Sequence, residues 1–525
     1  MSRVALAVCL AATVTVSAQV DYGRIVGAQQ SPEDWLTYSG SYSSQRFSTL
    51  DQVNRTNVAR LRPAWVYQVR RPTGTLQTTP LVAAGTMYLT EPGAGVTALD
   101  ARTGRALWTY TPAAPAQPLT RVNRGVALLD DTVYVGTVSA RLIALDARSG
   151  AVRWDVAVGE YSRGYYITAA PLALNGRIVV GVSGGDYGAR GYLDAYDAKT
   201  GERLWRRYTV PVPGEPGAET WPDESSRRGG GSTWLTGSYD PALNLLYWGT
   251  GNPAPLWNRD DRDGDNLYTC SVLAIDVTTG EITWHFQFMP GDTHDWDANQ
   301  IPVLFDAVVE GRSRPLLVTA NRNGFYYVLD RATGEFLRAT PFVKQTWAEG
   351  IDGTGRPVLG PRSQPTREGT LIYPGVGSAA NWWSPSFSPL TGLFYQPAGE
   401  SGTTYFKGEA VYTPGVAFTG GGVRHIDVEE RWGAIRALQA TTGELRWEFR
   451  LTQPPVGGVL STAGGLVFGG TPEGNVFALD ADSGRPLWHF QAGSEIRANP
   501  ISFAVAGKQY VAVAAGNAMF AFALP

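Results

Sequence analysis

One short loop of this sequence carries an acidic side chain on an unusually bare backbone. In residues 182–191, VSGGDYGARG, Asp186 stands among four glycines. Gly and Asp both suit tight turns, which is the simpler interpretation. Glycine also lets a backbone approach a bound group closely, and a carboxylate in such a loop can bind a cation. The choice between the two depends on what accompanies Asp186 in the fold.

Other polar and aromatic side chains in loop-like stretches could act together with this carboxylate. Carboxylate and amide oxygens are the ligands that calcium-like cations prefer. Arginine suits carboxylates, and tryptophan offers a flat face on which an aromatic ring can stack. If the fold brings them together, the groups would suit a hard cation and a planar anionic ligand. They are Arg124 in VNRG, Trp234 in GGGSTW, Asn252 in GTGNP, Asp297 in HDWD, Arg322 in NRNG and Asn381 in AANWW.

A repeated phrase predicts the elements that must position these side chains. ALDARTGRALW ends at Trp108, and similar copies end at Trp154, Trp205, Trp284, Leu337, Trp447 and Trp488, with a degenerate copy at Trp65. The Asp opens a turn, the Gly takes a positive φ, and the Trp falls at a fixed offset where it can pack into the next unit. Sheets of hairpins repeated radially are typical of a β-propeller. We therefore expect an all-β, eight-bladed propeller with Trp-docking repeats.

The two ends of the sequence predict a ring closed by the N-terminal strand. QYVAVAAGNAMFAFALP supplies strands at the C-terminus without a following Trp turn, and the strand around Trp65 could complete that sheet. Closure of this kind hides edge strands. Long insertions interrupt the repeats at 205–275 and 337–437. Because a ring brings one end of every blade to a common axis, the polar groups can converge there.

The N-terminus predicts an exported, periplasmic protein. Arg3, the short apolar stretch 4–16 and the small residues at 16–18 are typical of a signal peptide, although a buried segment is the alternative. We expect residues 1–18 to be removed and residues 19–525 to form a single propeller domain. No later stretch is long and apolar enough to predict a membrane span. A net charge of -3 gives no sign of a nucleic-acid surface.

The cysteines limit the redox chemistry that the chain can carry. Only Cys9 and Cys270 occur, and loss of a signal peptide would leave Cys270 without an intrachain partner. No CxxCH motif is present, so no covalent c-type haem is expected.

The repeat, together with GGG..W, GTGNP, WD after HD, and NRNG in this order, resembles the quinoprotein dehydrogenases. These are eight-bladed enzymes that oxidise alcohols or sugars with pyrroloquinoline quinone (PQQ) and a metal ion. The likeness extends from DWLTYSG to the C-terminus. It implies an oxidoreductase that oxidises the hydroxyl group of an alcohol, sugar or polyol with PQQ and calcium. Without a fused haem, it would pass electrons to a separate acceptor, expected to be a soluble cytochrome c.

The resemblance also implies a role for each matching residue. Asp186 and Asn252 match metal ligands, and Asp297 matches the catalytic base that also touches the metal. Arg322 matches the basic residue beside the reactive carbonyls of the quinone, and Trp234 matches the floor on which the quinone lies. The other implied cofactor contacts are Gln77, Arg124, Thr168, Ser183, Gly184, Gly185 and Asn381.

The sequence departs from the family pattern at several of these positions. Asp186 stands where the family has the longer Glu, and Gln77 stands where it has another Glu. Pro118 and Leu119 occupy the place of an adjacent Cys-Cys pair that covers the quinone in many members, so an apolar lid would replace it. Both Asp186 and the lost disulfide could weaken the binding of metal or quinone.

Two further departures concern the stretch THDWDANQ. Lanthanide-using members have a second acid two residues after the catalytic Asp, and Asn299 stands there, which favours calcium over a lanthanide. The stretch is two residues longer than the common form, so Asp295 is an alternative to Asp297.

Two other functions remain open from the sequence. Envelope assembly proteins use similar repeats without a cofactor, so the chain could be a non-catalytic scaffold. Such a scaffold has no need for Trp234, Asn252, Asp297 and Arg322 in that order. The third alternative is a degenerate enzyme that has lost its metal.

Overall fold

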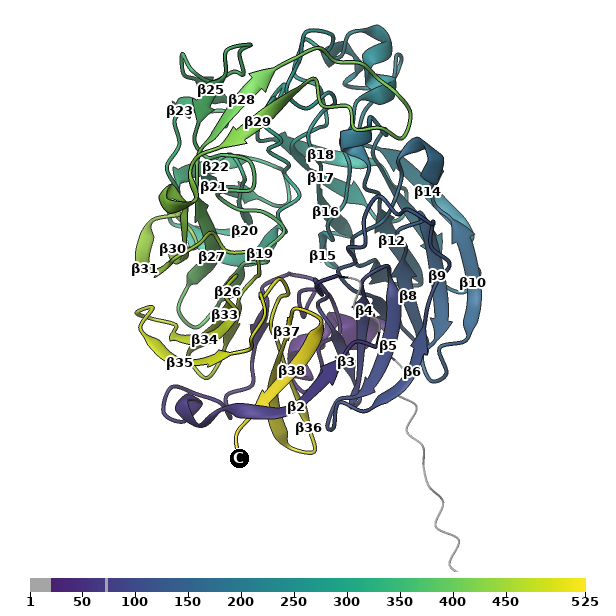
Figure 1. Cartoon of the computed structure of the whole chain (residues 1–525), viewed down its shortest axis with the longest axis vertical. Coiled ribbons are helices and arrows are strands. Elements are labelled where there is room, and N and C mark those ends of the chain that lie inside the picture. The colour runs from purple at the N-terminus through teal and green to yellow at the C-terminus, as the bar shows by residue number, and fades with distance from the viewer. Residues whose placement is uncertain (1–19, 71–73) are drawn as a thin grey trace, which may run out of the picture.

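A computed structural model describes residues 20–70 and 74–525, and the predicted signal peptide lies outside them. Regular structure in the described residues is nearly all β, and Figure 1 shows the sheets arranged around a common axis. One short α-helix, α1 (Tyr22–Val26), precedes them. The 3-10 turns are η1 (Ala28–Gln30), η2 (Val58–Arg60), η3 (Tyr161–Arg163), η4 (Gly185–Tyr187), η5 (Ala218–Thr220), η6 (Asp223–Arg228) and η7 (Val428–Glu430).

The first half of the chain forms antiparallel meanders whose strands pair in chain order. The first sheet contains β3 (Leu81–Ala83), β4 (Thr86–Glu91), β5 (Gly95–Asp100) and β6 (Ala106–Tyr110). The next contains β7 (Ala127–Leu129), β8 (Thr132–Gly136), β9 (Arg141–Asp146) and β10 (Val152–Ala157). Two more follow: β11 (Leu172–Leu174), β12 (Arg177–Gly181), β13 (Tyr192–Asp197) and β14 (Arg203–Tyr208), then β15 (Ser238–Asp240), β16 (Leu245–Gly249), β17 (Ser271–Asp276) and β18 (Ile282–Gln287).

The second half continues the same pattern with one interruption. One sheet contains β19 (Val303–Val309), β20 (Arg312–Ala320), β21 (Phe325–Asp330) and β22 (Phe336–Pro341). The next joins β26 (Ser386–Ser388) and β27 (Leu393–Glu400) to β30 (Trp432–Gln439) and β31 (Leu445–Leu451). The segments around it form two small sheets, β23 (Ala348–Ile351) with β24 (Pro357–Leu359), and β25 (Thr370–Ile372) with β28 (Thr403–Lys407) and β29 (Gly421–His425).

The last two sheets include strands from the N-terminal part of the chain. β32 (Leu460–Thr462), β33 (Leu466–Gly470), β34 (Asn475–Asp480) and β35 (Pro486–Gln491) are joined by the parallel strand β1 (Phe47–Ser48). β36 (Ile501–Val505), β37 (Lys508–Ala515) and β38 (Ala518–Ala523) are joined by β2 (Arg62–Gln68), which pairs with β38. The strand around Trp65 therefore completes the C-terminal sheet, as the sequence predicts.

Each repeat tryptophan docks on the turn of a neighbouring repeat. The indole N–H of Trp65 donates to the carbonyl of Ala101 at 3.1 Å, and a Cβ atom on Gly104 would lie 2.6 Å from the same indole. Gly104 has φ +72°, so only glycine suits both the turn and the contact. Equivalent bonds join Trp108 to Ala147, Trp154 to Ala198, Trp205 to Val277, Trp284 to Arg331, Trp447 to Ala481 and Trp488 to Leu61.

The copy that ends at Leu337 uses a different docking residue. The hydroxyl of Tyr326 donates to the carbonyl of Ala440 at 2.8 Å, and its ring packs where a Cβ atom on Gly443 would lie. Tyr326 is fully buried. A tyrosine from β21 thus takes the place of the missing tryptophan.

Burial follows the position of each strand in its sheet. β8 and β16 are buried along their whole length, whereas exposed residues recur at every second position of β6. Strands between two neighbours lose both faces to packing, while a strand at the rim keeps one face in water. None of the helices in the described part of the chain has the length and apolarity that a membrane crossing requires.

Candidate functional site

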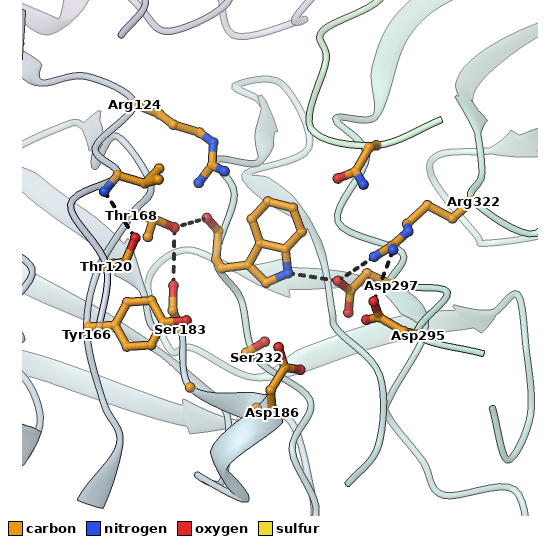
Figure 2. A pocket seen from close by; sticks show the side chains of 15 residues that line it. Thr120, Arg124, Tyr166, Thr168, Ser183, Asp186, Ser232, Asp295, Asp297 and Arg322 are labelled. Atoms are coloured by element: carbon orange, nitrogen blue, oxygen red, sulfur yellow. Dashed lines mark hydrogen bonds and ion pairs between the residues drawn. The ribbon is translucent and has the colours of Figure 1, made fainter. Parts of the chain in front are cut away.

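A cavity of about 290 Å³, which we call the central cavity, gathers side chains from loops far apart in the sequence (Figure 2). All the site residues predicted from the sequence line it except Gln77 and Asn252. The lining consists of Thr120, Val122, Arg124, Tyr166, Thr168, Ser183, Gly184, Gly185, Asp186, Ser232, Trp234, Asp295, Asp297, Arg322 and Asn381.

The topology of the sheets explains why these residues meet. In an antiparallel meander, the chain enters the first strand at the same end of the sheet as the turn between the second and third strands. The residues that precede a first strand are Arg124, Thr168, Trp234, Asp297 and Asn381. The residues in turns between second and third strands are Asp186, Asn252 and Arg322. All of them therefore lie at one end of their sheets.

Asp186 sits in the turn η4, between two glycines with positive φ. Gly184 and Gly188 have φ of +118° and +70°, and a Cβ atom on Gly184 would clash with the carbonyl oxygen of Gly164. The Asp186 side chain is open to the solvent of the cavity. Surrounding protein reduces its hydration and, with the negative charge of Asp297, raises the pKa of Asp186 to about 6. A bound cation would stabilise the ionised form.

Asp297 is buried and held from three sides. Its Oδ2 atom accepts hydrogen bonds from Arg322 Nη1 at 3.0 Å and from Trp234 Nε1 at 3.1 Å. Its Oδ1 atom accepts from the backbone N–H of Asn252 at 2.7 Å. Burial raises the pKa of Asp297, and the charge of Arg322 opposes that rise. Arg322 also reaches Asp295, with its Nη2 atom 3.2 Å from Asp295 Oδ2, as Figure 2 shows.

Arg124 is a buried cation that lies between two indole rings. Its guanidinium carbon is 5.0 Å from the ring centroid of Trp234 and 4.9 Å from that of Trp382. Burial lowers the pKa of Arg124 to about 10. Its Nε and Nη1 atoms have no hydrogen-bond partner in the described residues. Since an unpaired buried donor costs stability, these atoms suit an anionic ligand in the cavity.

Three predicted residues need separate mention. Asn252 is not in the lining of the cavity, but its backbone N–H bonds Asp297, which is. A hydrogen bond from its side chain favours the ionised form of Asp186 and so opposes the rise in the pKa of Asp186. Asn381 lines the cavity, and its Oδ1 atom accepts from the backbone N–H of Trp382 at 2.8 Å. Gln77 is half-buried outside the lining, so its predicted contact with a cofactor in the cavity is not supported by its position.

The loop that includes Pro118 and Leu119 contributes the residues that follow them to the cavity wall. Thr120 and Val122 line the cavity, whereas Pro118 and Leu119 do not. Pro118 and Leu119 are therefore not among the residues that line the cavity, and their role as an apolar lid over a bound quinone stays a prediction.

Besides Thr120 and Val122, two lining residues escaped the sequence interpretation. Tyr166 lies two residues before Thr168, and Ser232 lies two residues before Trp234. In extended chain, alternate residues face the same side. That spacing is the one signal that could have identified them.

The side chain of Asn299 bonds to Trp234 and to the backbone behind it. With its amide oriented to satisfy both atoms, its nitrogen donates to the Gly249 carbonyl at 2.7 Å. Its oxygen accepts from Trp234 Nε1 at 3.0 Å and Gly251 N at 3.1 Å, two N–H groups that it shares with Asp297 and the Ser232 carbonyl. It is 2% exposed and does not line the cavity. Asn299 therefore braces the indole and the loop that leads to Asn252.

The donor set fits a hard cation beside a planar anion. No group of three or more His, Cys, Asp or Glu side chains that could hold a metal occurs in residues 20–70 and 74–525. The available oxygens come from Asp186, Asp297 and the amide of Asn252, a mixed set of the kind that calcium accepts. The unpaired donors of Arg124 and the flat face of Trp234 fit the carboxylates and rings of a quinone such as PQQ.

Two family models match different parts of the chain. Residues 35–345 match the family model described as "Glucose/ethanol/alcohol dehydrogenase, beta-propeller domain", and residues 431–524 match the one described as "Outer membrane protein assembly factor BamB". Quinoprotein alcohol dehydrogenase PedH of Pseudomonas putida is 39% identical over 529 residues, which cover 95% of this chain and 89% of that protein.

A second relative and a solved structure cover similar lengths. The lanthanide-dependent methanol dehydrogenase of Methylacidiphilum fumariolicum is 37% identical, over 94% of this chain and 86% of that protein. The structure of a europium-containing methanol dehydrogenase matches with a TM-score of 0.90 at 34% identity, over 96% of this chain and 100% of that chain.

Proposed function

The chain belongs to the PQQ-dependent (quinoprotein) alcohol dehydrogenases, and on that premise we propose that the central cavity is its active site. There the enzyme oxidises the hydroxyl group of an alcohol, or of a sugar or polyol, with PQQ and a bound calcium ion. One observation carries the proposal above all: Asp297, Arg322 and Trp234, distant in sequence, are joined by hydrogen bonds in the wall of one cavity.

Asp297 is the proposed general base. Its two oxygens are oriented by Arg322, Trp234 and the backbone of Asn252, so the carboxylate cannot rotate away from the cavity. Burial raises its pKa, which makes it a stronger acceptor for the hydroxyl proton of the substrate. Asp295, also paired with Arg322, is the alternative base.

Arg322 supplies a fixed positive charge beside Asp297. It is 4% exposed, so its charge acts through protein and not through bulk water. A preorganised cation of this kind stabilises negative charge that develops during the reaction. When bound, PQQ supplies the hydride acceptor and the metal ion polarises its carbonyl group.

The remaining lining residues would hold the cofactor and the ion. Trp234 would stack on the quinone, and Arg124 would pair with a carboxylate. Thr168, which bonds the Trp234 carbonyl at 3.0 Å, and Ser183 would contribute hydroxyl groups, and Gly184 and Gly185 would allow close approach of the backbone. The metal ligands would be Asp186, Asn252 and Asp297.

Calcium is the proposed ion, although relatives of this chain include a lanthanide-dependent enzyme. The proposed ligands include two carboxylates, Asp186 and Asp297. Asn299 is a neutral amide and adds no third charge, and its side chain bonds Trp234 and the backbone. A divalent ion matches that charge better than a trivalent one.

The wider architecture and location are also proposals. We infer eight blades in a closed ring from the β2–β38 pairing and from the contact of Trp488 with Leu61. The chain between residues 19 and 525 would form this one domain. Residues 1–18 would direct export to the periplasm, where a soluble cytochrome c would accept the electrons.

A non-catalytic scaffold is the competing function, favoured by the match of residues 431–524 to an assembly-factor model. The central cavity argues against it. A buried Arg124 with unpaired donors and a buried, paired Asp297 cost stability that a scaffold has no reason to lose. A degenerate enzyme without metal would keep these groups, so metal analysis of the PQQ-loaded protein separates it from an active one.

The decisive experiment reconstitutes the purified protein with PQQ and calcium and follows dye reduction with alcohols, sugars and polyols. We expect substrate-dependent reduction that needs both additions, with a quinone absorption band in the titrated protein. A protein that neither binds PQQ nor reduces the dye would contradict the proposed function.

A further inference from the structure

A loop without regular strand structure forms one wall of the central cavity. Residues 117–122, which we call the covering loop, place Thr120 and Val122 in the lining while Gln117 and Arg121 remain exposed to solvent. Two internal contacts shape it: Val122 N donates to Thr120 Oγ1 at 3.1 Å, and Gly93 N donates to the Arg121 carbonyl at 2.7 Å. An exposed loop of this kind loses conformational freedom when it is held over a cavity.

One hydroxyl group ties this loop to a neighbouring segment of the cavity wall. Tyr161 Oη accepts a hydrogen bond from Leu119 N at 2.8 Å and donates one to the Gln117 carbonyl at 3.1 Å. The two bonds use the lone pair and the proton of the same hydroxyl, so they are compatible. Together they close the turn at the start of the covering loop.

Tyr161 belongs to a neighbouring segment that supplies further lining residues. It opens η3, which leads through Gly164 to the lining residues Tyr166 and Thr168. Two residues beyond the covering loop, Arg124 N donates to the Thr168 carbonyl at 3.0 Å, which joins the chain after the loop to the same segment. The segment 161–168 therefore bonds the start of the covering loop and the chain just after its end.

No covalent bond contributes to this attachment in the described part of the chain. Cys270 is the one cysteine there; it is free and buried. The hydrogen bonds of Tyr161 are consequently the side-chain link that fixes the start of the loop.

We propose that Tyr161 is a positioning residue that holds the covering loop over the bound cofactor, by a link that does not depend on the redox state of the surroundings. This inference rests on the proposed function for the identity of the cofactor. The attachment of the loop itself can be tested without any cofactor.

The first test is limited proteolysis of the cofactor-free protein. Tyr161→Phe removes the hydroxyl and keeps the ring, and we expect trypsin to cut after the exposed Arg121 about tenfold faster, as two lost hydrogen bonds of ordinary net strength imply. Tyr395→Phe is the matched control, because its hydroxyl donates to the Ala481 carbonyl at 3.0 Å between later repeats. Cutting at other sites should not change in Tyr161→Phe, and Tyr395→Phe should leave cutting after Arg121 at the wild-type rate at a temperature where it is fully folded.

The second test measures the release of PQQ from protein loaded with PQQ and calcium. We expect Tyr161→Phe to release PQQ about tenfold faster than the wild type or Tyr395→Phe, and dithiothreitol to leave the wild-type rate unchanged. Equal Arg121 cleavage and equal release in Tyr161→Phe and wild type would overturn the role of Tyr161. A wild type that binds no PQQ would instead refute the proposed function, while the proteolysis result would still decide whether Tyr161 holds the loop.

Discussion

The indole N–H of Trp234 donates to Oδ2 of Asp297 at 3.1 Å. A residue suited to carry a planar ring thus also orients the carboxylate proposed as the base. Arg322 donates to the same oxygen at 3.0 Å, so two donors converge on one atom and Oδ1 is left to the backbone of Asn252. In the proposed function, one contact would therefore link the ring that carries the quinone to the carboxylate that accepts the proton, and substitutions can test the two roles separately.

Replacing Asp297 with Asn should remove the proposed base and leave the shape of the cavity intact. We expect kcat to fall by about 10²- to 10⁴-fold, the usual contribution of general base catalysis, with PQQ affinity changed only a few-fold. Dye-reduction kinetics and a PQQ titration measure the two effects. Asp295→Asn serves as the comparison. If Asp297→Asn kept full turnover and Asp295→Asn lost it, the base would be Asp295.

Substitutions of Trp234 should separate its ring from its N–H group. Trp234→Phe keeps an aromatic face and loses the bond to Asp297, so we expect kcat to fall more than PQQ affinity does. Trp234→Ala removes the face as well, and PQQ affinity should fall about tenfold or more, since aromatic contacts and buried area are both lost. Trp383→Phe, outside the lining, is the control. Unchanged PQQ affinity in Trp234→Ala would exclude stacking on this indole.

Asp186 should be required for the metal ion. Asp186→Asn removes a charged oxygen ligand, and we expect calcium affinity, measured by calorimetry in the presence of PQQ, to fall by about 10²-fold. Asp146→Asn, in the turn of a repeat where Asp146 accepts backbone bonds, should leave calcium affinity unchanged. Removal of the ion with a chelator should abolish dye reduction, and added calcium should restore it. Equal calcium affinity in Asp186→Asn and wild type would move the metal elsewhere.

Asn299→Asp should destabilise the protein without creating a lanthanide site. The Asn299 nitrogen donates to the Gly249 carbonyl at 2.7 Å, and a carboxylate oxygen in its place would face another acceptor in a buried position. We expect a loss of about 1–3 kcal/mol in the free energy of unfolding. Terbium luminescence should show no gain in lanthanide affinity. Tighter terbium binding at unchanged stability would mean that position 299 can reach the ion.

The docking of repeats should govern stability rather than catalysis. Trp447 is buried and donates to the Ala481 carbonyl at 3.1 Å, so Trp447→Ala should cost about 3 kcal/mol and lower the melting temperature. Gly484→Ala should also destabilise, since its φ is +71° and a Cβ atom would lie 2.5 Å from the Trp447 ring. Leu390→Ala, at a side chain that is 68% exposed, is the control. Lower turnover in Trp447→Ala at a temperature where it is fully folded would contradict this division.

The all-β class and the spacing of the repeats could be predicted because their causes are local. An Asp that opens a turn, a Gly with positive φ and a Trp at a fixed offset act over about ten residues, and Trp65 with Gly104 shows the result. The convergence of Asp186, Asp297 and Arg322 could be predicted as well, because a radial repeat places equivalent loops at one end of their sheets. These features follow from residue order alone.

The tertiary structure alone decided how individual side chains are used. It turned Asn299 toward Trp234 and left Gln77 outside the cavity lining. It placed Thr120 and Val122 in the lining, next to Pro118 and Leu119. It also let Tyr326 replace the tryptophan that is missing at Leu337. Tyr161 acquired its contacts with Gln117 and Leu119 in the same way. Each of these depends on distances between residues far apart in the sequence. Spacing along the chain sets which loop a residue occupies, but packing between loops determines the direction in which it points.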